Sequence, residues 1–147
     1  ISLGLVGSEM CIETGDGLHA LSFFSREEGF PSSIHSVVCG DRHSLALTSD
    51  GDCYFWGWSV FHGHTLPEPV DVGHGPDLVN VTSMACATDV SIFLLEDGSV
   101  WSTKRGDTET RFATEAHRVQ FHGMNYPLDI GAAQWSYYAL VQNKESA

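Results

Sequence analysis

Positive charge is scarce in this sequence of 147 residues. Seven Lys and Arg stand against 19 Asp and Glu, which gives a formal net charge of −12. The nearest approach to a basic cluster, Lys104-Arg105, is soon followed by Asp107 and Glu109. Binding to DNA or RNA normally needs a basic stripe that displaces counterions. We therefore expect no direct nucleic-acid binding, and we expect protein partners, for which a basic surface is the natural match.

Long apolar runs are also missing. No stretch approaches the roughly 20 residues that a membrane-spanning helix needs, so no membrane span is expected. The sequence begins at Ile1 without a basic-then-apolar signal pattern, which indicates a trimmed start or a piece of a longer chain. With 42% hydrophobic and 18% charged residues, its composition is typical of one globular domain with a core.

Motifs for catalysis and cofactor binding are absent. The sequence has no GxGxxG or Walker loop, no GxSxG and no HExxH, so we expect no enzyme chemistry, no catalytic residue and no cofactor. His62, His64 and His74 form the one metal-like group, but no Cys or carboxylate completes it, and no metal site is predicted. The four cysteines form no CxxC pair. We interpret them as buried free thiols of an intracellular protein of unknown compartment.

What the sequence does contain is a repeat. Cys39 and Cys86 lie 47 residues apart, and so do Gly51 and Gly98. A fixed period of this size is typical of a repeat architecture.

The clearest copy reads as a β-hairpin. Leu45 and Leu47 alternate with Ala46, which predicts a strand packed on both faces. Asp50-Gly51 is a strong signal for a tight turn. The aromatic run over 53–56 then predicts a returning strand that ends at Gly57.

The other copies follow the same plan less closely. Ile92 to Leu95 leads to Asp97-Gly98, and Met10 to Ile12 leads to Asp16-Gly17. In the last copy, Tyr138-Ala139-Leu140 takes the place of Leu45-Ala46-Leu47. The expected repeats are 1–33, 34–80, 81–128 and a truncated start of the next at 129–147.

Three segments between the hairpins, 25–33, 59–76 and 103–115, are rich in Gly, Pro, His or charged residues and are interpreted as loops. Each precedes a short apolar stretch that predicts a further strand: 34–38, 78–81 and 118–121. The sequence thus predicts an all-β fold, a partial β-propeller of about three four-stranded antiparallel blades. Three blades cannot close a ring, so we expect missing sequence or another chain to complete it.

Residues 39–57 resemble the repeat of the regulator of chromosome condensation family. That repeat typically reads Cys/Ala-Gly-x-x-His-Ser/Thr-x-Ala-Leu, then Asp-Gly, then aromatic-x-Trp-Gly, and Pro67-Glu68-Pro69-Val70 is similar to its Pro-x-x-Val lead into the next blade. The resemblance implies a propeller that usually has seven blades. It also implies a structural histidine at His43 that bonds backbone across the blade. The implied structural residues of the repeat are Gly40, His43, Asp50, Gly51, Trp56, Gly57, Asp97, Gly98 and Trp101.

Several positions depart from this repeat. The third copy has Ala87 for the first Gly and Val90 for the His, and the fourth has Ala133 and Ser136 there. The family's Gly-Gln-Leu-Gly loop is replaced by residues 61–66. These copies are interpreted as drifted repeats.

Two functions are consistent with these features. The first is a protein-interaction or structural module of a larger assembly. The alternative, implied by the resemblance, is a guanine nucleotide exchange factor whose loops favour the nucleotide-free state of a small GTPase. Aromatic and charged residues expected outside the strands are the candidate interaction residues, although Trp58 and Phe61 would equally cover a blade edge. The set is Trp58, Phe61, His62, His64, Asp107, Glu109 and Tyr126.

Overall fold

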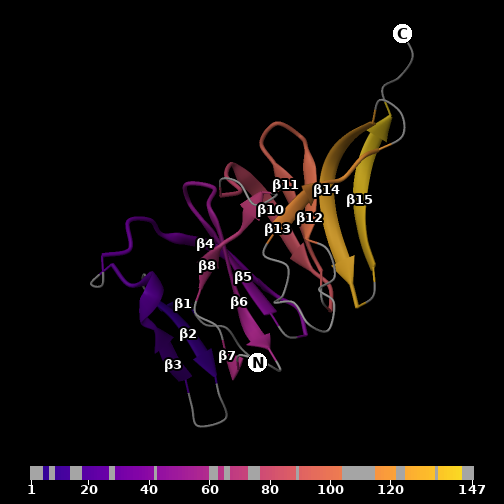
Figure 1. Ribbon diagram of the computed structural model, residues 1–147. Helices are drawn as coiled ribbons and strands as arrows, with labels where there is room; N and C mark the ends of the chain where they lie inside the picture. Colours follow the sequence, from indigo (N-terminus) through magenta and orange to yellow (C-terminus); the bar gives the residue numbers. More distant parts are fainter. Residues whose placement is uncertain are drawn as a thin grey trace.

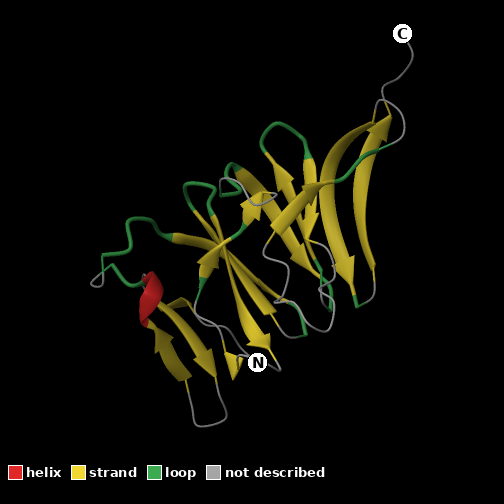
Figure 2. Ribbon diagram, viewed as in Figure 1, coloured by secondary structure: helices red, strands yellow, loops and turns green. Residues whose placement is uncertain are grey.

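The computed structural model describes the chain except for residues 1–4, 7–8, 14–17, 27–28, 42, 60–62, 65–66, 73–76, 89, 104–114, 122–124, 135 and 144–147. Strands dominate the described part, and its one helix is the three-residue 3-10 helix η1 (Ser22–Phe24) (Figure 2). The sheets follow one another in chain order across the molecule (Figure 1). The predicted all-β fold is confirmed.

Each sheet is built mainly of antiparallel neighbours in sequence. The first contains β1 (Leu5–Val6), β2 (Glu9–Glu13) and β3 (Leu18–Leu21). The second contains β4 (Ile34–Cys39), β5 (His43–Thr48) and β6 (Cys53–Ser59), with β7 (Gly63–His64) and β8 (Glu68–Pro69) both paired to β6. The third contains β10 (Val81–Cys86), β11 (Ser91–Leu95), β12 (Val100–Thr103) and β13 (Glu115–Arg118), beside which β9 (Asp71–Val72) runs parallel. The last pairs β14 (Asn125–Ala133) with β15 (Ser136–Asn143).

The period of 47 residues is visible in the hairpin turns. Thr48 N donates to Asp52 O at 2.9 Å, and Leu95 N donates to Ser99 O at 2.9 Å. Gly51 and Gly98 have φ angles of +87° and +78°, a conformation that glycine adopts without steric cost. The predicted Asp-Gly turns are therefore equivalent in the second and third sheets.

A β-bulge recurs in the first long strand of each sheet from the second onward. The register shifts at His35 in β4, at Thr82 in β10 and at Leu128 in β14. The first two bulges lie 47 residues apart and the last two 46 apart. One residue has therefore been lost between the third and fourth copies.

The sheets stack face to face, as blades do. Because side chains alternate along a strand, Leu45 and Leu47 face the third sheet while Ala46 packs with Phe24 on the opposite face. In the third sheet, Phe93 packs back against the second. The chain thus forms a partial β-propeller, with β10 packed on β4 and β5, and β14 on β10 and β11.

Some predicted boundaries were wrong. The expected loop over 59–76 contains the short strands β7, β8 and β9, and β6 continues past Gly57 to Ser59. The strand expected over 78–81 starts only at Val81, and that expected over 118–121 is β13, which ends at Arg118. These short strands lack apolar alternation, so the pairing partner defines them rather than the local sequence. No helix in the described ranges is long and apolar enough to cross a membrane.

Candidate interaction surface

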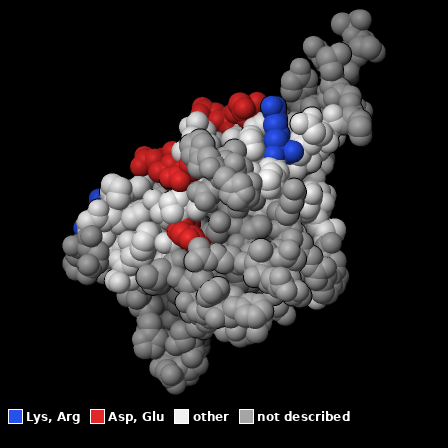
Figure 3. All heavy atoms as spheres, in the orientation of Figure 1, with Lys and Arg blue, Asp and Glu red and all other residues white. Residues whose placement is uncertain are grey.

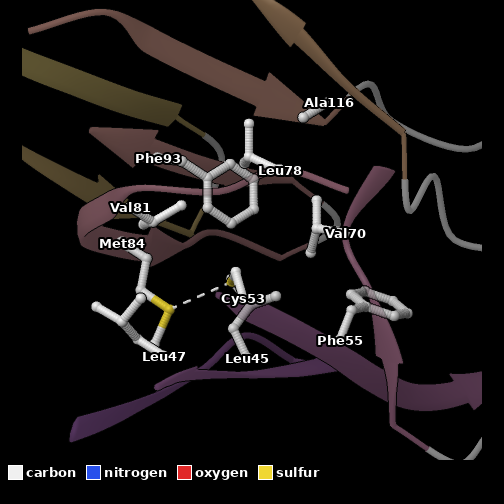
Figure 4. Packing of buried hydrophobic residues seen from close by; sticks show 10 residues of the cluster. All are labelled: Leu45, Leu47, Cys53, Phe55, Val70, Leu78, Val81, Met84, Phe93 and Ala116. Atoms are coloured by element: carbon white, nitrogen blue, oxygen red, sulfur yellow. Dashed lines mark hydrogen bonds between the residues drawn. The ribbon is translucent and has the colours of Figure 1, made fainter. Parts of the chain in front are cut away.

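The interface between the second and third sheets is a continuous apolar core (Figure 4). Leu45, Leu47 and Phe93 are at most 3% exposed. The thiol of Cys53 lies 3.8 Å from Met84 Sδ, and burial raises its pKa above the ordinary value. Burial also raises the pKa of the Cys86 thiol, to about 12. Because the thiolate is the reactive form, both thiols are expected to be inert.

A buried histidine also links the two sheets. His43 Nε2 lies 2.8 Å from Ser91 Oγ on β11, and the His43 ring stacks on Phe55 at 5.5 Å. Ser91 N in turn donates to Thr103 Oγ1 at 2.8 Å. The resemblance implied a bond from His43 to backbone across the blade, and that bond stays a prediction. The bond to Ser91 joins the histidine to a side chain of the next blade.

Gly40 fits the same junction for a steric reason. A Cβ at this position would overlap the carbonyl oxygen of Ala87 and lie 2.7 Å from the His43 ring. The backbones of two neighbouring blades approach closely here, and only glycine leaves the room. Gly57 lies in register opposite His43, on β6.

The remaining predicted repeat residues lie in the turns and on the flanking sheet faces. Trp56, 7% exposed, packs on Phe24 with ring centroids 5.7 Å apart. Trp101 is half-buried, and its Nε1 donates to Ser99 Oγ at 2.9 Å. Hydrogen bonds from Ser99 hold the pKa of Asp97 below its usual value. Asp50 is exposed in the β5–β6 turn.

The outer face of β15 carries the exposed apolar surface. Tyr138 and Leu140 are 62% and 60% exposed, while Ala139 between them packs on the core of the third sheet. Tyr138 pairs with Gly131 and lies over it, since a Cβ there would be 2.5 Å from the tyrosine ring. Leu128, at the bulge of β14, is 55% exposed. We call Leu128, Tyr138 and Leu140 the open face.

The sequence contains a signal for this surface, although none of the three is among the predicted interaction residues. Tyr138 and Leu140 occupy the places of Leu45 and Leu47, which are buried against the next sheet. In the third sheet the equivalent Ile92 and Leu94 are buried against β14 and β15.

The predicted interaction residues are not brought together into one described site. Phe61, His62, Asp107 and Glu109 lie outside the described residues. Trp58, His64 and Tyr126 were expected in loops, but they lie in β6, β7 and β14. The role of this set stays a prediction. Within the described ranges, no three His, Cys, Asp or Glu residues gather as metal ligands would.

Stacked antiparallel sheets at a repeating interval define a segment of a repeat β-propeller. The sequence profile of the regulator of chromosome condensation (RCC1) repeat matches residues 34–62, which are β4 to β6 and the segment after them. The chain therefore carries the repeat of the regulator of chromosome condensation family, and the resemblance seen in the sequence is confirmed.

Curated relatives match about half of the chain. The ultraviolet-B receptor UVR8 of Arabidopsis thaliana is 36% identical over 81 residues, which are 51% of this chain and 18% of that protein. The RCC1-like G exchanging factor-like protein of Mus musculus is 35% identical over 82 residues, 52% of this chain and 18% of that protein. The match thus spans less than a fifth of the length of these relatives.

Solved structures of low identity share the fold. Human WBSCR16 superposes with a TM-score of 0.59 at 22% identity, over 76% of this chain and 31% of that one. Yeast RCC1 (Prp20), solved with Kap60, gives 0.61 at 18% identity, over 92% and 36%. The likeness supports a partial propeller.

Proposed function

We propose that this chain is a structural and protein-interaction module of a larger assembly, and that its open face is covered there by a further blade. The main support for this proposal is that Tyr138 and Leu140 are exposed, whereas the equivalent residues of the two preceding sheets are buried. A contiguous apolar surface on a sheet face is typical of an interface. The proposal includes the expected repeats at 1–33, 34–80 and 81–128, the start of a further repeat at 129–147, and an intracellular role.

The covering sheet should resemble those already seen in the chain. Leu45 and Leu47 are covered by β10 and β11, and Ile92 and Leu94 by β14 and β15. In both cases the second strand of the covering sheet contributes one residue that faces the preceding sheet. This residue is Phe93 in the third sheet and Ala139 in the fourth. A further blade from the same polypeptide or from a partner would cover Tyr138 and Leu140 in the same way.

The test is the association of the purified chain. We expect the wild type to self-associate or to bind a dye specific for exposed apolar surface, and Y138S/L140S to do so much less. Tyr137, 41% exposed and one residue along the same strand, supplies the matched control Y137S, which should behave as the wild type. A wild type that stays monomeric without binding the dye, or equal behaviour of all three proteins, would contradict the proposal.

A second candidate is guanine nucleotide exchange, which is favoured by the 35% identity to an RCC1-like G exchanging factor-like protein. The structure of the yeast relative Prp20p was described with its binding to Gsp1p and histones. In either function the chain binds proteins and has no chemistry of its own. A nucleotide-release assay with purified small GTPases separates the two candidates, because acceleration by the chain would support exchange.

A further inference from the structure

A hollow with a mixed polar and apolar lining lies between the second and third blades, where their hairpin turns meet. It encloses about 330 Å³ and is lined by residues of the β5–β6 turn, of the segment that enters β10, and of the turn after β11. Its volume is within the range of small-ligand sites. The hollow lies at the edge of the blades that carries the Asp-Gly turns, away from the open face of β15.

The lining is apolar at depth and acidic at the rim. Leu47 and Val81 line the hollow and are nearly buried, at 3% and 4% exposed. Asp50 and Glu96 line the hollow and are exposed. Its lining residues, all in the described part of the chain, include no Lys or Arg. In Figure 3, acidic side chains lie along the upper edge of the molecule, and a basic side chain lies beside the uppermost of them.

Hydrogen bonds between the two blades and within the third blade fix the walls. Val81 N donates to Gly51 O at 3.0 Å, and Glu96 N donates to Asn80 O at 2.9 Å. Thr82 Oγ1 donates to Leu94 O at 3.1 Å. The backbone around the hollow is therefore held before any ligand arrives, which lowers the entropic cost of binding.

We propose that this hollow takes one lysine or arginine side chain of a basic protein segment. Such a side chain lays its aliphatic stem on apolar surface and keeps its charged end at a polar rim. Here the stem would lie over Leu47 and Val81, and the charge would lie at Asp50 and Glu96. This proposal deepens the proposed function, on which it rests, by naming the chemistry of a partner.

The next interface supplies an internal comparison. The residues equivalent to Asp50 and Glu96 are Asp97 and Gln142, so that interface has one carboxylate in place of two. Two bulge residues, His35 in β4 and Thr82 in β10, also line the hollow. The bulge residue at the equivalent place in β14 is the apolar Leu128. The acidic rim is therefore a property of the first interface rather than of the repeat.

The test uses short peptides that share a neutral sequence and carry a central Lys, Arg or acetyl-lysine, titrated into the chain while methyl signals of Leu47 and Val81 are followed by NMR. We expect the Lys and Arg peptides to shift these signals and acetyl-lysine to have no effect. Stronger binding of one of the two cationic peptides would identify the side chain. Because exposed ion pairs contribute little, D50N and E96Q should each weaken binding about two- to five-fold, and added salt should weaken it further.

The matched control is D41N, which makes the same charge change in the β4–β5 turn, at the opposite end of β5. Asp41 is exposed, and D41N should bind as the wild type does. Equal binding by D50N/E96Q, equal binding of acetyl-lysine, or an equal loss in D41N would each overturn the proposal. These results leave the open-face assay unaffected, so failure here and failure of the proposed function are distinguishable.

Discussion

The two interfaces on either side of the third blade have the same register but are held together differently. Between the second and third blades, a large apolar cluster is joined by the buried pair His43–Ser91. Between the third and fourth, the cluster is smaller and centres on Ile92, Leu94, Val100 and Ile130. There Thr88 donates from both its backbone N and its Oγ1 to Gln134 O, at 3.0 and 2.5 Å.

The difference shows which features of a repeat must persist. Val90 has replaced the histidine in the third copy, so the side-chain link of the first interface cannot form in the second. A link to the backbone at Gln134 takes over, while the alternation of inward and outward side chains is kept. Register is essential because a slip by one residue would send every apolar side chain to the wrong face. The polar link can be made by different residues at each interface.

The largest expected effect comes from truncating equivalent leucines in the two interfaces. Leu47→Ala removes a side chain from the larger cluster and Leu94→Ala from the smaller. Each should lower the free energy of unfolding by about 2–5 kcal/mol. Leu47→Ala should be at the upper end, because Leu47 is 3% exposed and Leu94 is 9% exposed. Chemical denaturation measures both. A greater loss for Leu94→Ala would mean that the smaller interface is the stronger one.

Replacing His43 by the valine of the third copy should have the next largest effect. His43→Val removes the histidine partner of Ser91 Oγ, and Ser91 is 1% exposed. A buried polar group that loses a hydrogen-bond partner destabilises the fold by about 1–3 kcal/mol. Ser91→Ala and the double variant complete a cycle, in which we expect the double variant to lose less than the sum of the singles. Strict additivity would show that the pair contributes no coupling.

The alternation in the sequence was sufficient to predict the hairpins and the stacking. Leu45-Ala46-Leu47 gave the faces of the second blade. In the matching run of the last copy, Ala139 packs on the third sheet, while Tyr138 and Leu140 are exposed. The partner of His43 could not be predicted, because it depends on how two sheets align in space. Strands β7 to β9 were missed because Gly, Pro and His give no apolar period, and the hollow needs two turns that lie far apart in sequence.

Filling the close contact between blades should cost somewhat less. Gly40→Ala places a methyl group against Ala87 O and the His43 ring, and overpacking of this kind costs about 1–3 kcal/mol. The matched change is Ala87→Gly at the equivalent position of the third blade, where no new atom is added. Thermal unfolding should show a clear loss for the first and a smaller one for the second. Similar losses of stability in the two variants would show that the close contact at Gly40 is not the steric constraint.

The smallest effect on the fold, and the sharpest contrast in chemistry, concerns two equivalent cysteines. Cys39 ends β4 and is exposed, whereas Cys86 ends β10, is half-buried and has its pKa raised to about 12 by burial. At pH 8 a thiol reagent should therefore modify Cys39 much faster than Cys86, since only the thiolate reacts. The raised pKa also stabilises the fold fully below the ordinary thiol pKa of about 8.5, and this contribution declines as pH rises toward 12. Peptide mapping after timed labelling measures the order, and C39S should remove the fast phase. Equal rates at the two sites would show that burial does not protect Cys86, and the contrast between the two cysteines would fail.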